Sequence, residues 1–233
     1  MVALHVIETG HGACFGDRWP QPRCLLSASG ENFSLTGDPD ALAPGDLDER
    51  ISGLLDAPPV FEALLEASFE AVGHWDRRIF QLASSPKKPA AVAAEIRPLQ
   101  AVDAHHVYAL AEDTSWISST WGGPFGLCTG GLGIGAFMGG QLVSVAVPFY
   151  VGERYEDIGV VTEPGYRGRG LSAACAAALS QAVVSRGHVP SWSTSNDNLA
   201  SLRVAEKLGF QLHREDLLYV IRAEIPESAS PES

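Results

Sequence analysis

The chain has 233 residues, of which 45% are hydrophobic and 19% are charged, and its mean hydropathy is +0.05. This composition is typical of a globular protein with a core. The sequence contains no run of about 18 apolar residues, which a membrane span would need. The formal net charge of −12 would repel a phosphate backbone, so we expect neither nucleic acid nor a membrane as a partner.

The first residues, MVALHVIETGHGACFGDRW, contain neither a basic leader nor an apolar stretch of signal-peptide length, so we expect a cytoplasmic protein. The cysteines Cys14, Cys24, Cys128 and Cys175 form no CxxC pair and no metal-ligand spacing with histidine. This pattern favours buried free thiols and predicts no metal site. A homodimer is compatible with the sequence, but no feature fixes the oligomeric state.

Residues 1–89 predict a small N-terminal α/β subdomain of unknown role. The stretch PRCLLSASGENFSLTGDPDA favours short strands and turns, whereas DLDERISGLLDAP and PPVFEALLEASFEAV show helical patterns. The segment SSPKKPA, residues 84–90, combines two prolines and two lysines without apolar periodicity, as expected of an exposed connection. We therefore predict a second domain over residues 90–225, followed by a disordered tail, residues 226–233.

The second domain shows strands and helices in a clear order. A strand in VAAEIRPL precedes a helix in AVDAHHVYALAE and a polar aromatic loop, DTSWISSTWGGP. The strands LGIGAFM and QLVSVAVPFYV, joined by Gly139 and Gly140, predict a hairpin. The elements that follow are a strand in YEDIGVVT, a glycine-rich turn, a helix over about residues 171–186, a strand in VPSWSTS, a helix in NLASLRVAEKLG and a strand in QLHREDLLYVIRA.

The glycine-rich turn lies in TEPGYRGRGLSA, residues 162–173. Apolar residues then recur at steps of three and four, which predicts a helix that begins near Leu171. The first N–H groups of such a helix point back into the turn and, together with the helix dipole, favour an anion such as a pyrophosphate. Gly168 and Gly170 allow close approach of that anion because they carry no Cβ.

Two other phosphate sites fit this turn less well. Gly165 and Gly170 match the spacing of a P-loop, but a leucine and a serine follow where that motif requires lysine and then serine or threonine. Gly168, Gly170 and Ala173 satisfy a dinucleotide fingerprint. However, EPGYR separates these glycines from the strand, and the next strand ends without an acidic residue for a ribose.

The segment DIGVVTEPGYRGRGLSAA resembles the signature of the GNAT superfamily of N-acetyltransferases, a strand followed by an RxxGxG/A turn that opens a helix. Arg167, Gly170 and Ser172 take the motif positions, with serine in place of the usual glycine or alanine. Downstream, NLASLRVAEKLGF, residues 198–210, resembles the late helix of the superfamily. The resemblance covers residues 91–222 and leaves residues 1–89 outside.

This resemblance implies a mixed α/β (α+β) sheet that is splayed beside DIGVVT and flanked by helices, with acetyl-CoA as the co-substrate. The backbone of Val160, Val161 and Thr162 would pair with the pantetheine arm, and an N–H near Val161 would serve as the oxyanion donor. Asn198 would touch the coenzyme, although an N-cap role fits the same residue. The residues implied to hold the diphosphate are Arg167, Gly168, Arg169, Gly170, Leu171, Ser172 and Ala173.

An amine with a pKa of about 10.4 is mostly protonated at neutral pH, so attack on a thioester requires a base. The candidates are Glu156 and Asp157, with Glu163 weaker because it adjoins the turn; each also fits a solvated strand-end charge. The superfamily's usual general acid is a tyrosine seven residues after the helix asparagine, where this chain has Ala205. Either Tyr219 replaces it, or no acid is needed because a thiol pKa of about 8.5 makes a tolerable leaving group.

The acceptor site implied by the resemblance lies on DTSWISSTWGGP and on YVGERYED. Trp116 and Trp121 would stack on a substrate, and Glu153 with Glu156 would attract a cation, although tryptophans in a loop also commonly pack over a core edge. We therefore predict an N-acetyltransferase that moves an acetyl group directly from acetyl-CoA to a small-molecule or peptide amine. The alternatives are a non-catalytic acyl-CoA-binding module and, more distantly, a dinucleotide oxidoreductase.

Overall fold

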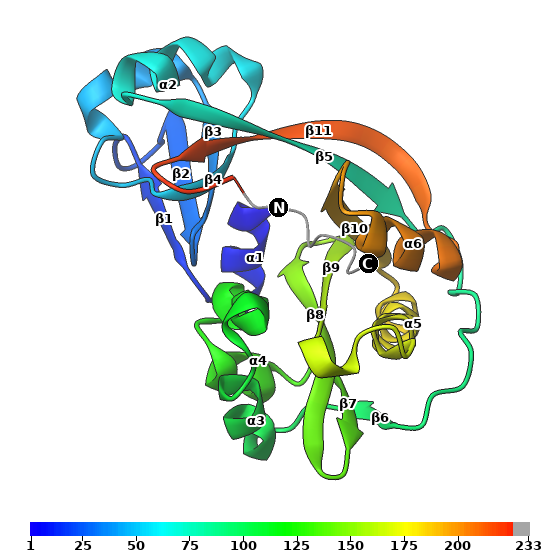
Figure 1. The fold of residues 1–233 in the computed structure, drawn as a ribbon. Helices are drawn as coiled ribbons and strands as arrows, with labels where there is room; N and C mark the ends of the chain where they lie inside the picture. Colours follow the sequence, from blue (N-terminus) through cyan, green and yellow to red (C-terminus); the bar gives the residue numbers. More distant parts are fainter. Residues whose placement is uncertain (226–233) are drawn as a thin grey trace.

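The computed structural model describes residues 1–225 and contains an 11-stranded sheet in the order β1-β2-β3-β4-β11-β5-β10-β9-β8-β7-β6 (Figure 1). The strands are β1 (Ala13–Gly16), β2 (Cys24–Ser29), β3 (Asn32–Gly37), β4 (Gly53–Asp56), β5 (Val72–Gln81), β6 (Glu95–Pro98), β7 (Ile134–Met138), β8 (Gln141–Val151), β9 (Tyr155–Thr162), β10 (Val189–Ser195) and β11 (Gln211–Ile221). The tail predicted for residues 226–233 lies outside the described residues.

Helices cover both faces of the sheet. The α-helices are α1 (Val2–Thr9), α2 (Glu62–Ser68), α3 (Ala104–Tyr108), α4 (Pro124–Gly130), α5 (Leu171–Ser185) and α6 (Leu199–Leu208). The 3₁₀ helices are η1 (Pro39–Ala41), η2 (Pro44–Asp46), η3 (Pro59–Phe61), η4 (Ala101–Asp103), η5 (Glu112–Trp121) and η6 (Pro164–Tyr166). Within the described residues, none of these helices is long and apolar enough to cross a membrane.

Two cores lie on opposite faces of the strands from β7 to β10. On one face, α5 buries a run of small residues that includes Ala173, Ala176 and Ala177, together with Trp192 of β10 and the inner side of α6. On the other face, α3, α4 and η5 pack with β7 and β8 around Ile117. Because alanine side chains are small, α5 lies close against the sheet, and the mixed sheet with flanking helices that the resemblance implied is confirmed.

The N-terminal part, β1 to β4 with α2, has a third core that includes residues of β11. Strands β5 and β11 pair with each other over most of their length, and β5 also pairs with β10. Figure 1 shows these two long strands arching over α1 to join the parts. One sheet therefore contains strands from before and from after residues 84–90, where the sequence predicted a domain boundary.

Helix α1 is fixed to the C-terminal part by His5, which is buried. The Nε2 atom of His5 lies 2.8 Å from the carbonyl oxygen of Thr120, and the N–H of Val151 donates to its Nδ1 at 3.0 Å. Since Nδ1 accepts, the proton of the neutral ring is on Nε2, which donates to Thr120. Burial lowers the pKa of His5, in agreement with a neutral ring.

Most predicted elements after residue 90 are confirmed, including the hairpin at Gly139 and Gly140 and both motif helices. The helix predicted in DLDERISGLLDAP is wrong, because β4 lies there. Leu47, Ile51 and Leu55 have the spacing of a helix face and are all buried, but a 3₁₀ turn followed by a strand brings them into one core. Helix α1 and strand β5 were not predicted, and the aromatic loop contains η5.

The cysteines are free, and Cys24, Cys128 and Cys175 are buried as predicted. Cys14 is exposed, so the prediction of burial was wrong for that residue. It lies in the edge strand β1, where no further strand covers it.

Candidate active site

The sheet opens between β9 and β10. These parallel strands pair only from Tyr155 with Val189 to Asp157 with Ser191. Beyond that point β10 continues to pair with β5, as far as Ser195, while β9 continues to pair with β8, as far as Thr162. The C-terminal halves of β9 and β10 therefore diverge and leave a gap between them, which we call the β9–β10 gap.

The pairing of β9 with β8 fixes which peptide groups face this gap. The N–H of Glu163 donates to the carbonyl oxygen of Val143 at 3.0 Å, so the peptide N–H of residue 163 points toward β8. In an antiparallel ladder peptide groups alternate in direction, which directs the peptide groups of Val161 toward β8 and those of Val160 and Thr162 toward the gap. The carbonyl oxygen of Thr162 accepts from Arg167 Nε at 3.2 Å, as this orientation requires.

The turn between β9 and α5 presents backbone N–H groups. Gly168 and Gly170 have φ of +75° and +76°, a left-handed conformation that glycine adopts at little cost. The first bond inside α5 is donated by the N–H of Ala174 to the carbonyl oxygen of Gly170 at 3.1 Å. The N–H groups of residues 171–173 therefore point along the helix axis into the turn, and no side chain caps them.

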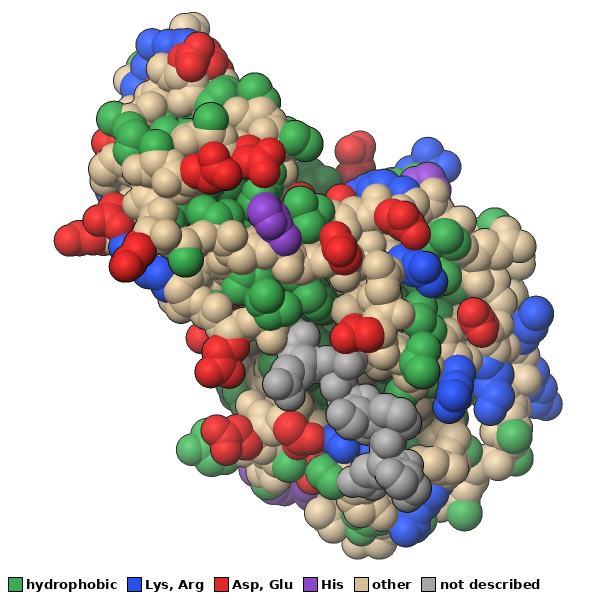
Figure 2. Space-filling view, turned by 45° about the horizontal axis from the view of Figure 1, so that its top comes forward, with side chains coloured by type: hydrophobic (Ala, Val, Ile, Leu, Met, Phe, Trp, Pro, Cys, Tyr) green, Lys and Arg blue, Asp and Glu red, His purple; other side chains and the backbone are tan. Residues whose placement is uncertain are grey.

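Two arginines of the same turn remain exposed. Arg167 donates to the carboxylate of Asp113 in η5 at 2.5 Å, which ties the turn to an element on the other face of the sheet. Arg169 donates to the carbonyl oxygen of Gly165 at 3.1 Å, and its guanidinium lies 5.1 Å from the centre of the Tyr166 ring. Figure 2 shows Lys and Arg side chains gathered on the right, the side on which Figure 1 places α6 and the connection from β5 to β6.

Glu156 and Asp157 point to opposite faces of β9 and have different partners. Glu156 is buried at the end of α5, where Arg186 donates to both of its carboxylate oxygens at 3.0 and 2.6 Å. His188 Nδ1 lies 2.9 Å from the same carboxylate. These contacts hold the residues that follow α5 against the Glu156 side chain of β9.

Asp157 lies on the face opposite α5, where it is 7% exposed. The hydroxyls of Ser191 and Ser193 on β10 donate to its Oδ1 at 2.9 and 3.1 Å. Burial raises the pKa of Asp157, while the two serine hydroxyls and the distant charge of Arg77 act in the opposite direction. A buried carboxyl with a raised pKa beside a cavity is a candidate for acid–base chemistry.

A cavity of about 340 Å³ lies over Asp157. Its floor is the polar face of β9, β10, β5 and β11, with Ser191, Ser193 and Arg77 among the contributing side chains. Tyr150 of β8 also lines it and stands beside Asp157 in the sheet register. The cavity therefore brings a buried acid and several hydrogen-bonding groups together at the base of the β9–β10 gap.

The family model described as GNAT acetyltransferase matches residues 1–219. The chain belongs to the GNAT acetyltransferase family. An uncharacterized N-acetyltransferase from the mutA 5′ region of Streptomyces virginiae is 34% identical over 188 residues, which cover 79% of this chain and 78% of that protein. The uncharacterized N-acetyltransferase YdfB of Bacillus subtilis (strain 168) is 26% identical over 112 residues, which cover 48% of this chain and 43% of that protein.

Solved structures share the fold. The crystal structure of a GCN5-related N-acetyltransferase-like protein from Streptococcus suis 89/1591 superposes with a TM-score of 0.68 and 23% identity, over 93% of this chain and 90% of that chain. A GCN5-related N-acetyltransferase from Kribbella flavida gives a TM-score of 0.62 and 15% identity, over 92% of this chain and 90% of that chain. The GNAT family match includes residues 1–89, so the resemblance seen in the sequence covered too little of the chain.

The late helix of the GNAT motif is capped as its sequence suggested. Asn198 Oδ1 accepts from the N–H of Ser201 at 3.0 Å, and the contact of Asn198 with a coenzyme stays a prediction. Ala205, which stands where the family's tyrosine would be, is fully buried in the core beneath α6. This position therefore offers no hydroxyl to the gap.

The structure does not bring Tyr219 together with Asp157. Tyr219 is buried in the N-terminal core, where its sheet neighbours are Leu55 and His74. The tyrosine that pairs with Asp157 in the sheet register is instead Tyr150, whose pKa is raised by burial. Tyr150 could not be found from the sequence, because an irregularity between Pro148 and Tyr150 sets its register against β9.

The predicted acceptor residues lie in different surroundings. Trp116 is 44% exposed and packs edge-on against Phe149, on the same face of the sheet as Asp157, beside Gly159 of β9. Glu153 is exposed in the connection between β8 and β9. Trp121 is 3% exposed, and its indole N–H donates to the carbonyl oxygen of Pro148 at 2.9 Å. Of the three, Trp116 is the one whose ring adjoins the central strand at the gap.

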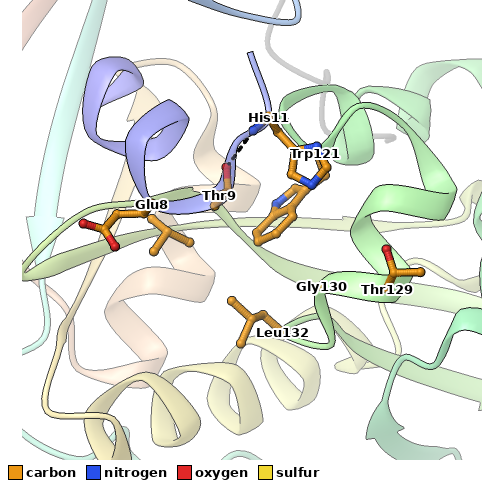
Figure 3. A pocket seen from close by; sticks show the side chains of 8 residues that line it. Glu8, Thr9, His11, Trp121, Thr129, Gly130 and Leu132 are labelled. Atoms are coloured by element: carbon orange, nitrogen blue, oxygen red, sulfur yellow. Dashed lines mark hydrogen bonds between the residues drawn. The ribbon is translucent and has the colours of Figure 1, made fainter. Parts of the chain in front are cut away.

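Trp121 lines a second cavity of about 420 Å³ at the end of α1 (Figure 3). Figure 3 shows His11 above the indole, with Glu8 and Leu132 on the other sides. The ring of His11 lies 5.6 Å from that of Trp121, and Glu8 is exposed. This cavity contains no buried carboxyl among its lining residues, so the cavity over Asp157 is the better candidate for acid–base chemistry.

A pair of glycine substitutions at the two ends of α5 tests the turn. Gly170 and Gly187 both have positive φ, and a Cβ at either meets open space or a contact no closer than 3.6 Å. Alanine at either position therefore costs a similar backbone strain of about 1–2 kcal/mol. Only Gly170→Ala places its Cβ beside the N–H groups of the turn, so we expect it to weaken coenzyme A binding about tenfold or more.

The measurement is calorimetric titration with coenzyme A, and Gly187→Ala is the matched control with the affinity of the unmodified chain. Equal affinities for the two variants would contradict the placement of the diphosphate at this turn.

Proposed function

We propose that this chain catalyses direct transfer of an acetyl group from acetyl-CoA to an amine, with Asp157 as the general base. The observation that carries the proposal is the position of the buried Asp157 carboxyl at the point where β9 and β10 separate. Family membership supports acetyl transfer, and the geometry of the gap supports the assignment of roles.

The residues present fit an acyl-CoA. The gap exposes peptide groups of Val160 and Thr162, which would pair with the amides of the pantetheine arm as a further strand does. The N–H groups at the start of α5, with Arg167 and Arg169 beside them, would hold the diphosphate. Bound acetyl-CoA supplies the acetyl group as an activated thioester.

The N–H of Val160 is the donor that we assign to the thioester carbonyl oxygen. It faces the gap, whereas the peptide groups of Val161 are directed toward β8. A backbone N–H fixed in a strand needs no reorganisation to stabilise the negative charge that develops on that oxygen. The sequence predicted a donor near Val161. Because peptide groups alternate in direction along β9, we assign this role to the adjacent Val160.

Asp157 would receive the proton that the amine loses. In the reaction, the new bond joins the amine nitrogen to the acetyl carbon, and the carbon–sulfur bond breaks. The proton leaves the nitrogen for the Asp157 carboxylate, and the electron pair of the broken bond goes to sulfur. Because a thiol has a pKa of about 8.5, the thiolate leaves without a strong acid, and Tyr150, which pairs with Asp157 in the sheet register and lines the same cavity, is a tyrosine available as a donor.

One observation favours a second candidate, a module that binds acyl-CoA without catalysis. The buried Ala205 stands at the position where the family generally has a tyrosine as the acid. Thiol release from acetyl-CoA with a panel of amines, compared with calorimetric binding of coenzyme A, separates the two. We expect both binding and amine-dependent release, whereas binding without release would favour the module.

Replacement of the base tests the catalytic role of Asp157. We expect Asp157→Asn to lower kcat by about 10²–10⁴-fold without changing coenzyme A affinity. The pKa of Asp157 is raised in the folded protein, so the ionised side chain costs stability at pH values above that pKa. The same variant should therefore raise the melting temperature at neutral pH, as measured by calorimetry.

Glu156→Gln is the matched control on the adjacent residue. It weakens the ion pair with Arg186, so we expect a lower melting temperature with kcat retained within about threefold. If Glu156→Gln abolished turnover and Asp157→Asn did not, the assignment of the base would be reversed.

The two serines that hold Asp157 give a prediction for pH dependence. Their hydroxyls stabilise the ionised carboxylate and so lower its pKa. Ser191→Ala should therefore raise the pKa of Asp157 and move the acidic limb of the kcat profile to higher pH, because the base must be ionised to act. An acidic limb that stays in place, or moves to lower pH, would mean that another group controls it.

A further inference from the structure

The N-terminal part of the chain forms a wall of the cavity over Asp157. Asn32 at the start of β3, with Leu54 and Asp56 of β4, lines the cavity, and so does Val2 of α1. Facing them, the floor comes from β5, β9, β10 and β11. Residues far apart in the sequence thus enclose one space.

The continuous sheet explains why this wall is fixed in place. Strand β4 pairs with β11, β11 pairs with β5, and β5 pairs with β10, which carries the serines that bind Asp157. His5 holds α1 against η5 and β8 on the other side. The wall is therefore connected to the floor by backbone hydrogen bonds and by a buried histidine.

The charged and polar side chains that line the cavity determine which kind of ligand it can hold. Arg77, whose side chain is 11% exposed, donates to Asp216 at 2.6 and 3.0 Å and lies 3.8 Å from the carboxylate of Asp56. Arg214 and His213 line the same space. The lining carries side chains of both charges, so it suits a ligand with several polar groups, since an apolar ligand would bury these side chains without adding a hydrogen bond.

The size of the space limits the ligand. A cavity of about 340 Å³ is at the lower end of the range for small-molecule sites, which is about 300–1,000 Å³. It admits one compact molecule, whereas a peptide substrate usually needs an open groove along an edge or a surface.

We propose that the acceptor is a compact polar primary amine, a class that includes amino acids and amino sugars, and that residues 1–89 select it. This inference rests on the proposed function. The amine lies beside Asp157, and its other polar groups contact the wall made by Asn32 and Asp56 together with Arg77 of the floor. The N-terminal part is then a specificity element of the same active site.

Substitutions in the wall test this assignment. Asn32→Leu keeps the side-chain size but removes the hydrogen-bonding groups, and Leu54→Trp fills the space from the side of β4. We expect both to raise the KM for the acceptor about tenfold or more and to leave coenzyme A affinity unchanged. Thr36→Val, at an exposed position of β3 that does not line the cavity, is the matched control.

The acceptor class is measured with a panel containing amino acids, amino sugars, unsubstituted alkylamines and a lysine-containing peptide. Turnover with amino acids or with amino sugars, sensitive to both wall variants, supports the proposal and identifies which of the two is used. Preference for the peptide or the alkylamines, or an acceptor KM that neither wall variant changes, would overturn it.

The outcomes distinguish failure of the proposed function from failure of the role that we assign to residues 1–89. If the unmodified chain fails to bind coenzyme A in calorimetry, the proposed function itself is wrong, and this inference falls with it. If the chain binds coenzyme A and transfers acetyl groups, but the wall variants behave like Thr36→Val, only the role of residues 1–89 is wrong. Circular dichroism of each variant shows whether the fold is retained, and a variant that unfolds is replaced by Asp56→Asn.

Discussion

The end of pairing between β9 and β10 is the constraint on which the rest of the site depends. Past Asp157 and Ser191 each strand keeps only its outer partner, so peptide groups of Val160 and Thr162 face an open gap instead of a neighbouring strand. The turn that follows β9 directs the first N–H groups of α5 to the same region. One local divergence of two strands thus aligns a line of backbone donors for an extended, anionic ligand.

The alternation of side chains along β9 gives two adjacent carboxylates different surroundings. Glu156 faces α5, where it forms an ion pair with Arg186 and a hydrogen bond with His188, which makes it part of the framework. Asp157 faces the cavity, where serine hydroxyls are its bonded partners in the structure and burial raises its pKa. A buried carboxyl without a cationic partner in contact destabilises the fold when ionised, and such a cost is typical of groups retained for chemistry.

Local features of the site could be predicted from the sequence, and contacts between distant elements could not. The turn and both motif helices depend on short-range glycine placement and apolar periodicity, so they were predicted correctly. Glu156 and Asp157 could not be told apart, because their partners Arg186, His188, Ser191 and Ser193 all lie on later elements.

Strand β5 was missed since its polar residues, such as Arg77, face the cavity and interrupt the apolar pattern. Tyr219 was misplaced because the sequence does not show that β11 continues into the N-terminal core.

Hydrogen exchange of the β9 amides, measured by NMR with and without coenzyme A, tests the central claim most directly. Val160 and Thr162 direct their N–H groups into the gap, whereas the N–H of Val161 is already paired with β8. The account predicts that coenzyme A slows exchange at Val160 and Thr162 and leaves Val161 unchanged. Coenzyme A that binds without protecting Val160 and Thr162 would contradict it.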